Sequence, residues 1–345
     1  MASQKHLLVI RMSAMGDIAM TVPVLLALQQ HYPDLKITVL TRAFFKPLFS
    51  QLPNVYIFEA DVKGKHSGIS GLYLLFKELK ALKIDAVADL HNVLRSKVLK
   101  LFFTTAGIPV VQIDKGRSEK RALTALKNKQ FSPLKTTHQR YSDVFTALGF
   151  PIRLEKTSLL TKESLSTNAQ ALLGTNNKKR IGIAPFAAFS GKMYPLQLME
   201  QVVETLAKYD HYQIVLFGGG PKEKKALELW QNRYNNTLNV AGKFSFQEEL
   251  SIISQLDLML AMDSGNAHLA ANYGIPVVTL WGVTHPYAGF YPFRQPNENA
   301  LLADRSQYPL IPTSIYGNKL PKGYEKVMDT IRPASIIAKI EEIVN

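Results

Sequence analysis

One segment of the chain limits the possible fold more than any other. An apolar run from Leu256 to Met262 has the composition of a buried strand, and it ends in Asp263-Ser264-Gly265. The alanine-rich stretch 265–273 then predicts a helix, and a second apolar run, 275–281, follows at once. Two buried strands joined by one helix form a parallel unit. The pattern therefore predicts an α/β protein whose parallel sheet is covered on both faces.

The same alternation of strands and helices runs through both halves of the chain. In the first half we expect strands at 6–12, 36–41, 55–59, 85–90 and 109–114, and helices at 20–31, 71–82, 92–105 and 138–148. In the second half we expect strands at 180–185, 212–218, 237–241, 256–262 and 275–281, and helices at 194–209, 221–233, 245–255 and 265–273. A final helix is expected at 333–344, after irregular loops over 284–330.

A chain of 345 residues suggests two domains. We expect an N-terminal domain over 1–165 and a C-terminal domain over 176–330, both Rossmann-like, with the linker in the polar stretch 161–179.

The junction after Met262 also predicts a binding site. The first N–H groups of a helix have no intrahelical partner, and the helix dipole is positive there, so Ser264 and Gly265 can receive an anion. His268 lies one turn into the same helix. The other interpretation is that Asp263 only caps the helix and His268 is a packed core histidine. The turn alone leaves both interpretations open.

Two further turns follow expected strands. In 11–17, Gly16 precedes a carboxylate, Asp17, but the segment lacks G-x-G-x-x-G and so has no dinucleotide fingerprint. Its simpler interpretation is a helix cap. The small-residue loop 186–192 presents Lys192, a suitable point charge for a phosphate group, although an exposed loop lysine would look the same.

Two more strand ends carry polar or flexible residues. The glycines at 218–220 allow close approach to a ligand, and Glu223 can accept from ribose hydroxyls, although glycine turns are common. The segment 89–96 can contact an acceptor or simply start a capped helix. All these sites follow parallel strands, some in each half, so we expect the two sheets to face an interdomain cleft.

The positive charge of the chain is concentrated in its first part. The net charge is +14; residues 1–160 hold 23 Lys and Arg against 11 Asp and Glu, whereas 161–345 hold 18 against 16. Much of the excess comes from Lys115, Arg117, Lys120, Arg121, Lys127, Lys129, Lys135 and Arg140. This favours an anionic partner such as nucleic acid or an anionic lipid surface, the alternative being a solvated face. The stretch lacks the interleaved aromatic residues of a single-strand binder.

The chain has no cysteine, which excludes disulfides and thiolate metal sites. No apolar run reaches the roughly 18–20 residues needed to cross a bilayer. From these features we expect a cytoplasmic protein.

Several of these motifs together resemble a known family. They are Ser13-x-x-Gly16-Asp17 with Pro23, the loop Lys192, Gly219 to Glu223, and Asp263-Ser264-Gly265-x-x-His268 with the following Gly282-Val283-Thr284-His285-Pro286. In order and spacing they look like the ADP-heptose:lipopolysaccharide heptosyltransferases, glycosyltransferase family 9, over nearly the whole chain. The resemblance implies the GT-B fold, with the last helix, 333–345, packing back on the N-terminal domain. Ser264 stands where the family commonly has Thr, and Tyr194 where it has Trp or a similar residue.

The resemblance also implies roles for individual residues. Asp17 would be the general base of an inverting transfer. The donor-binding residues would be Lys192, Gly219, Gly220, Glu223, Phe244, Asp263, Ser264, Gly265 and His268. The acceptor-binding residues would be Ser13, Gly16, His91, Asn92, Arg95, Lys120, Arg121 and Arg140. The donor would be an ADP-sugar in the C-terminal domain, and the acceptor a lipopolysaccharide core or lipid A in the N-terminal one.

The chain contains no Asp-x-Asp motif, which many glycosyltransferases use to hold a metal ion. The helix start at Ser264, with Lys192 and His268, can stabilise the leaving diphosphate instead. We therefore expect no required cofactor, and a stimulatory divalent ion stays open. The expected partners are the ADP-sugar, an anionic glycolipid and, peripherally, the cytoplasmic face of the inner membrane, with no nucleic acid. The alternatives are a GT-B sugar-nucleotide epimerase or hydrolase, and a non-catalytic binder of nucleotide-sugar or anionic lipid.

Overall fold

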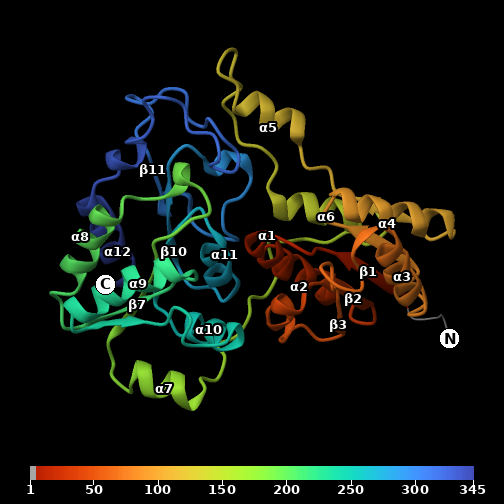
Figure 1. Cartoon of the computed structure of the whole chain (residues 1–345), viewed down its shortest axis with the longest axis horizontal. Helices are drawn as coiled ribbons and strands as arrows, with labels where there is room; N and C mark the ends of the chain where they lie inside the picture. The colour runs from red at the N-terminus through yellow and green to blue at the C-terminus, as the bar shows by residue number, and fades with distance from the viewer. Residues whose placement is uncertain (1–4) are drawn as a thin grey trace. The chain divides into compact units, whose positions relative to one another are not determined.

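The computed structural model describes residues 5–345, and this part of the chain divides into two compact units (Figure 1). The N-terminal unit runs to Gly116 and resumes over 136–159; the C-terminal unit combines 117–135 with 160–345. The first four residues of the expected N-terminal domain lie outside the described residues. Each unit is built around its own parallel sheet, which confirms the predicted α/β class.

The N-terminal sheet has five parallel strands in the order β3-β2-β1-β4-β5. They are β1 (His6–Ile10), β2 (Lys36–Thr41), β3 (Val55–Glu59), β4 (Ala86–Asp89) and β5 (Val110–Gln112). The apolar β1 is wholly buried, because it lies at the centre of a sheet whose two faces are covered. Ile10 pairs with Asp89 of β4, so the turns that follow these two strands lie next to each other.

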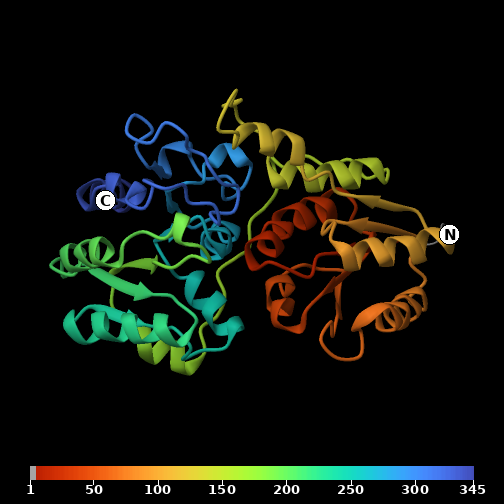
Figure 2. The same ribbon diagram turned by 45° about the horizontal axis from the view of Figure 1, so that its top comes forward.

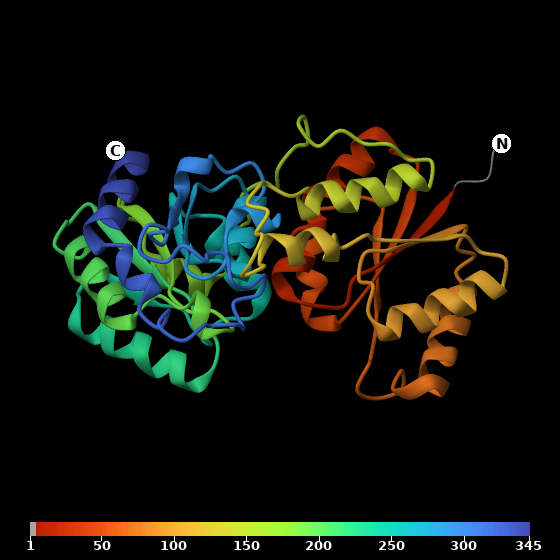
Figure 3. The ribbon, with the colours of Figure 1, turned by 90° about the horizontal axis from the view of Figure 1, so that it is seen from above.

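Helices cover both faces of this sheet. They are α1 (Met15–Ala19), α2 (Thr21–His31), α3 (Gly68–Lys80), α4 (Leu94–Thr105) and α6 (Thr137–Ala147), with a 3-10 helix η1 (Ala43–Phe49). Helices α3 and α4 lie side by side on one face, and α2 and α6 on the other (Figure 3). The α3–α4 layer packs on the sheet through buried leucine and phenylalanine side chains.

The C-terminal sheet has six parallel strands in the order β11-β10-β9-β6-β7-β8. They are β6 (Lys179–Ala184), β7 (Tyr212–Leu216), β8 (Thr237–Asn239), β9 (Leu258–Met262), β10 (Val277–Trp281) and β11 (Ala300–Leu302). Strands β9 and β10 are buried throughout, as their largely apolar sequences predict. Because β6 lies between β7 and β9, the loops after these three strands are neighbours at the carboxyl edge of the sheet.

The helices of the C-terminal unit are α5 (Arg117–Leu123), α7 (Thr167–Leu173), α8 (Leu196–Leu206), α9 (Pro221–Arg233), α10 (Phe246–Ile253), α11 (Gly265–Asn272) and α12 (Pro333–Val344), with short 3-10 helices η2 (Ser190–Lys192), η3 (Pro286–Ala288), η4 (Asn297–Asn299) and η5 (Val327–Thr330). The expected linker 161–179 contains α7, and the expected loop region 284–330 contains β11 and three of the 3-10 helices. Short elements of three to seven residues leave too little periodicity to be read from sequence.

The expected position of the last helix is wrong. Helix α12 lies beside α8 of the C-terminal unit (Figures 1 and 2). Its buried Ile336 and Ile340 join the same core cluster as Met199 and Leu206 of α8. The sequence shows that one stripe of this helix is apolar, but it does not show which apolar face the stripe meets.

The expected domain boundary also needs a correction, because residues 117–135 belong to the C-terminal unit. The segment is held there by Leu134 N, which donates to Tyr287 O at 2.9 Å, and by Phe131, whose ring lies 3.5 Å from the Arg305 guanidinium. The basic residues of this segment therefore belong to the C-terminal unit and not to the N-terminal domain to which we assigned them.

Among the described residues, no helix has both the length and the apolar character needed to cross a membrane.

Candidate active site

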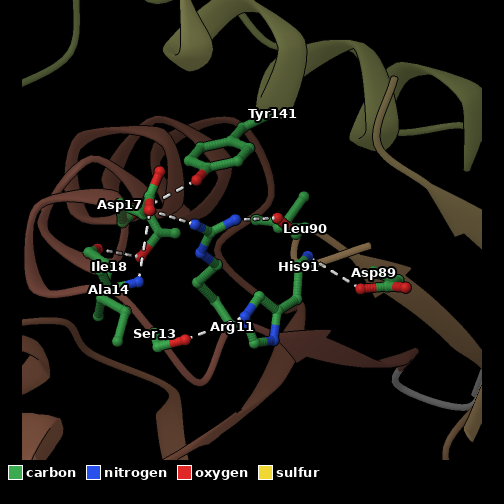
Figure 4. Close-up of polar contacts among 10 residues, drawn as sticks. Arg11, Ser13, Ala14, Asp17, Ile18, Asp89, Leu90, His91 and Tyr141 are labelled. Atoms are coloured by element: carbon green, nitrogen blue, oxygen red, sulfur yellow. Dashed lines mark hydrogen bonds and ion pairs between the residues drawn. The ribbon is translucent and has the colours of Figure 1, made fainter. Parts of the chain in front are cut away.

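The turn after β1 holds Asp17 in place. This residue lies in the first turn of α1, and its Oδ2 accepts from the backbone N–H of Ala14 at 3.3 Å (Figure 4). The same oxygen is 2.5 Å from Nη2 of Arg11, the residue that directly follows β1. Both contacts use Oδ2, so Oδ1 is left for another partner. The predicted helix cap and a chemically available carboxylate thus coexist in one residue.

Arg11 is a buried cation that the sequence analysis did not single out. Its Nη1 donates to Leu90 O at 2.6 Å, a contact that the pairing of β1 with β4 makes possible. Burial penalises its charge, but the nearby Tyr141, Asp17 and Asp89 outweigh this effect, and the pKa of Arg11 is raised. Arg11 therefore stays charged and fixes the position of the Asp17 carboxylate.

Tyr141 of α6 completes this cluster and was also missed. Its side chain is fully buried, and its hydroxyl donates to the backbone oxygen of Asp17 at 3.2 Å. Burial raises the pKa of Tyr141, so the hydroxyl remains a donor. The expected helix around 138–148 gave no indication that one of its tyrosines would reach the turn after the first strand.

The end of β4 brings His91 to the same place. Asp89 accepts from the backbone N–H groups of His91 at 2.9 Å and Asn92 at 3.0 Å, and from Gln112 Nε2 at 2.6 Å. His91 Nε2 lies 3.2 Å from Ser13 Oγ, and Nδ1 is a buried atom without a hydrogen-bond partner among the described residues. Burial, with the charges of Arg11 and Lys115, lowers the pKa of His91 to about 4, so its ring is neutral at physiological pH.

The other predicted acceptor residues do not join this cluster in the same way. Asn92 is tied to the fold, because its side-chain amide donates to Ile113 O at 2.9 Å. Arg95 is exposed in the first turn of α4. Lys120 and Arg121 lie on α5 in the C-terminal unit, and Lys120 is buried with Nζ 4.2 Å from the Phe290 ring. Their expected assignment to the N-terminal domain is therefore wrong.

The basic stretch 115–140 is not one solvated face. Arg140 is buried, and its Nη1 lies 3.8 Å from the Asp114 carboxylate. Lys129 Nζ donates to Leu123 O at 2.9 Å and to Pro312 O at 2.8 Å. These cations serve internal contacts, which a count of charges along the sequence does not reveal.

In the C-terminal unit, the loops after β6 and β9 bring Lys192 and Asp263 together. Their Nζ and Oδ2 atoms are 3.1 Å apart, and both side chains are largely buried. The loop before Lys192 is pressed against the segment after β10: Val283 N donates to Gly191 O at 3.0 Å, and a Cβ at Gly191 would come within 2.5 Å of the Val283 side chain. Lys192 therefore has a fixed place beside the start of α11.

The start of α11 keeps several polar groups unpaired. Ser264 is its N-cap residue but makes no capping hydrogen bond, and Ser264 Oγ is buried without a partner among the described residues. The same is true of His268 Nδ1, one turn further on, and of Thr284 Oγ1 after β10. Burial and the charge of Lys192 lower the pKa of His268 to about 3, so the ring is neutral. Buried polar groups are normally paired, so these atoms and the free N–H groups of the helix suit an anionic ligand.

The glycine loop after β7 lies beside the loop after β6, since a Cβ at Gly218 would come within 3.2 Å of Phe186. Gly219 N donates to Glu223 Oε2 at 2.7 Å, which closes the turn into α9. No atom lies within 4 Å of a Cβ placed on Gly220, so the approach to this backbone is open. Phe244 is half-buried in the loop between β8 and α10.

The structure also contains a titratable carboxyl group that the sequence analysis missed. Glu249 of α10 has its pKa raised to about 7 by burial, although the charge of Lys224 from α9 acts in the opposite direction.

Within residues 5–345, no group of three or more His, Asp or Glu side chains is arranged to hold a metal ion.

Two parallel-sheet units, with Asp17 after β1 in one and Lys192 beside the start of α11 in the other, form the arrangement that we expect of a glycosyltransferase with a nucleotide-sugar donor. Residues 72–312 match the model of glycosyltransferase family 9 (heptosyltransferase). The chain belongs to this family and is a glycosyltransferase, as the motifs led us to expect.

Individual relatives agree with this assignment. The chain is 26% identical to a lipopolysaccharide core heptosyltransferase of Haemophilus influenzae, over 82% of this chain and 80% of the relative. A family 9 glycosyltransferase of Veillonella parvula superposes with a TM-score of 0.74 at 20% identity, covering 100% of this chain and 98% of the other. A heptosyltransferase of E. coli, solved with ADP-2-deoxy-2-fluoro heptose, has a TM-score of 0.67 at 17% identity, covering 98% and 99%. These structures confirm the predicted GT-B class of fold.

Proposed function

We propose that this enzyme transfers heptose, or a related sugar, from an ADP-sugar to a lipopolysaccharide core or lipid A acceptor, with inversion at the anomeric carbon. The observation that carries the proposal is the start of α11, where Ser264 Oγ and His268 Nδ1 are buried, unpaired and next to Lys192. The chain's similarity to a heptosyltransferase that acts on a lipopolysaccharide core supports the acceptor, and its fold likeness to one solved with an ADP-heptose analogue supports the donor.

The C-terminal unit would bind the donor. Lys192 and the first N–H groups of α11 would receive the diphosphate, with Asp263 holding the lysine until a phosphate competes for it. The same groups stabilise the charge that builds on the departing ADP. The open backbone at Gly219 and Gly220 would lie against the nucleotide, the second oxygen of Glu223 would accept from the ribose, and Phe244 would pack on the adenine.

The N-terminal unit would bind the acceptor, with Asp17 as general base. The acceptor oxygen forms a bond to the anomeric carbon while the bond from that carbon to the phosphate oxygen breaks. The electron pair of the broken bond leaves with ADP, and the hydroxyl proton passes to Oδ1 of Asp17. Arg11 is a positioning residue in this scheme, because it holds Oδ2 and leaves Oδ1 to take the proton. Ser13 Oγ and the neutral His91 would hydrogen-bond the acceptor sugar.

The proposal requires no metal ion, because Lys192 and the start of α11 supply the positive charge at the diphosphate. A divalent ion could still raise the rate by binding the donor phosphates in solution.

Since the proposed acceptor is an anionic glycolipid, the enzyme would work in the cytoplasm, peripherally at the inner membrane.

The test is a donor panel with the purified full chain. ADP- and UDP-linked sugars are offered with lipopolysaccharide cores that lack heptose, with and without a chelator, and transfer is followed by mass spectrometry. We expect transfer from ADP-heptose and none from the UDP-sugars. Turnover of the donor without acceptor would indicate an epimerase or a hydrolase. Donor binding without turnover on any acceptor would indicate a non-catalytic binding protein. Either result would overturn the proposal.

A further inference from the structure

We propose that the outer surface of α3 and α4 docks the enzyme onto an anionic lipid bilayer. This α3–α4 surface carries Ile69 and Tyr73 from α3, and Leu94, Lys97, Lys100 and Leu101 from α4. The inference rests on the proposed function, since a glycolipid acceptor is presented at a membrane, but it names a surface away from the reacting groups.

The apolar side chains of this surface are unusually exposed for their type. Leu94 is 79% exposed, Ile69 73%, Leu101 60% and Tyr73 47%. The two helices are neighbours, because the Tyr73 ring meets the Phe102 ring of α4 edge-on at 5.4 Å. Both helices also bury a separate apolar stripe against the sheet. Single exposed apolar residues are ordinary, but a group on two adjacent helices marks an interaction surface.

The charges on these helices are almost all positive. Helices α3 and α4 together carry Lys77, Lys80, Arg95, Lys97 and Lys100, and their one carboxylate is Glu78. That carboxylate is already engaged by Lys65 and His66. Lysine can keep its ammonium group among lipid phosphates while its chain and the apolar neighbours enter the boundary of the acyl region. An anionic bilayer therefore complements both the charge and the apolar character of this surface.

The surface continues directly from the candidate acceptor site. Helix α4 begins at Leu94, two residues after Asn92 and three after His91, which contacts Ser13. In a parallel α/β unit the helices start at the carboxyl edge of the sheet, and this is the edge that carries Asp17. A lipid acceptor anchored in the membrane could thus present its sugar to that edge while the α3–α4 surface rests on the lipid headgroups.

The basic segment 117–135 is a poorer choice for this role. Lys129 donates to two backbone carbonyls, and Lys120 is buried against an aromatic ring. Segment 117–135 exposes one large apolar side chain, Leu126, whereas the charges of α3 and α4 are grouped with several, which a membrane surface can cover.

The test measures sedimentation of the full chain with lipid vesicles. Vesicles of equal parts phosphatidylglycerol and phosphatidylcholine are compared with vesicles of phosphatidylcholine alone. One variant combines Lys97→Gln with Lys100→Gln, another Ile69→Gln with Leu101→Gln. The matched control combines Lys225→Gln with Leu229→Gln on α9, where Lys225 is also exposed and Leu229 is 58% exposed.

We expect the wild type and the α9 control to bind the anionic vesicles alike. Each lysine removed from the α3–α4 surface should weaken binding about fivefold, less at high salt. The apolar variant should also bind more weakly, with its unfolding temperature unchanged. Equal binding by all four proteins would overturn the proposal. The proposal would also be overturned if the wild type self-associated in light scattering and the α3–α4 variants lost this self-association but kept vesicle binding. The surface would then be an interface between copies of the chain.

Transfer to a water-soluble core oligosaccharide separates this proposal from the proposed function. The α3–α4 variants should retain the wild-type kcat/KM on that acceptor and lose efficiency only on acceptor embedded in vesicles. If the wild type transfers to no acceptor but still binds vesicles through this surface, the proposed function fails and the docking surface stands. If transfer is normal and the variants bind vesicles normally, the docking surface fails alone.

Discussion

Asp17 shows how one side chain can satisfy its own turn and still be available for chemistry. Its Oδ2 holds the start of α1 and the buried Arg11, whereas Oδ1 takes part in neither contact. A carboxylate that served only as a cap would not need a buried cation beside it. Arg11 is such a cation, and it is itself anchored to Leu90 O, directly after β4. The arrangement therefore supports the proposed role of Asp17 as the general base.

Replacement of Asp17 by Asn tests this role. The amide keeps the size of the side chain but removes its basicity, so kcat should fall about 100- to 10,000-fold at saturating substrates. Donor affinity, measured by calorimetry with ADP, should change little. A variant that loses donor binding but keeps kcat would show that Asp17 serves the other substrate. A variant that unfolds but keeps normal activity per folded molecule would make Asp17 a structural cap.

Lys192 should act mainly on the donor. It is largely buried beside the start of α11, so Lys192→Ala should weaken ADP-sugar binding by about 1.5–3 kcal/mol, the range for a hydrogen bond to a charged group. Titration calorimetry measures the loss directly, and Lys208→Ala, at an exposed lysine of the same unit, provides the control. Unchanged donor affinity in Lys192→Ala would contradict the phosphate site.

At the scale of elements, the sequence predicted what periodicity and strand ends can encode. The long apolar strands, the helix after Gly265 and the turn at Asp17 lie where they were expected. The roles of Arg11 and Tyr141 could not be predicted, because they depend on the register of β1 with β4 and on where α6 packs. The partners of Lys120 and Arg140 were missed for the same reason: burial of a charged side chain is decided by tertiary contacts.

Helix α10 should make the stability of the C-terminal unit depend on pH. The pKa of Glu249 is about 7 in the folded protein against an ordinary 4.5, because burial disfavours the charged form. A raised folded pKa means that the folded state binds the proton more tightly. The stabilisation is therefore complete below about pH 4.5 and is lost as the pH rises to about 7.

Glu249→Gln removes this titration, because the amide stays neutral. The variant should match the wild type at about pH 4 and be more stable at about pH 8, where each 1 kcal/mol raises Tm by roughly 2–4 °C in a unit of this size. Thermal unfolding followed by circular dichroism gives both values. If Tm changes with pH in the same way for both proteins across this range, the raised pKa of Glu249 is contradicted.

At the scale of the whole molecule, α12 contributes to the core of the C-terminal unit. Ile340 is fully buried in the core that also contains residues of α8 and the central strands of the C-terminal sheet. Ile340→Ala should therefore cost about 2–5 kcal/mol in that unit. Hydrogen exchange read by mass spectrometry should show lower protection over β6–β10 and unchanged protection over β1–β4. Lower protection in the N-terminal unit would instead support the first expectation, that the last helix packs on the N-terminal domain.

The central claim is that the two units together perform one inverting transfer from an ADP-sugar to a lipopolysaccharide acceptor. The most direct measurement is the structure of the product. An ADP-heptose of known anomeric configuration is reacted with a heptose-deficient core, and the new linkage is assigned by NMR. The account predicts a glycosidic bond of the opposite anomeric configuration, with ADP released in equal amount. A product of retained configuration, or free heptose and ADP without any glycosidic bond, would contradict it.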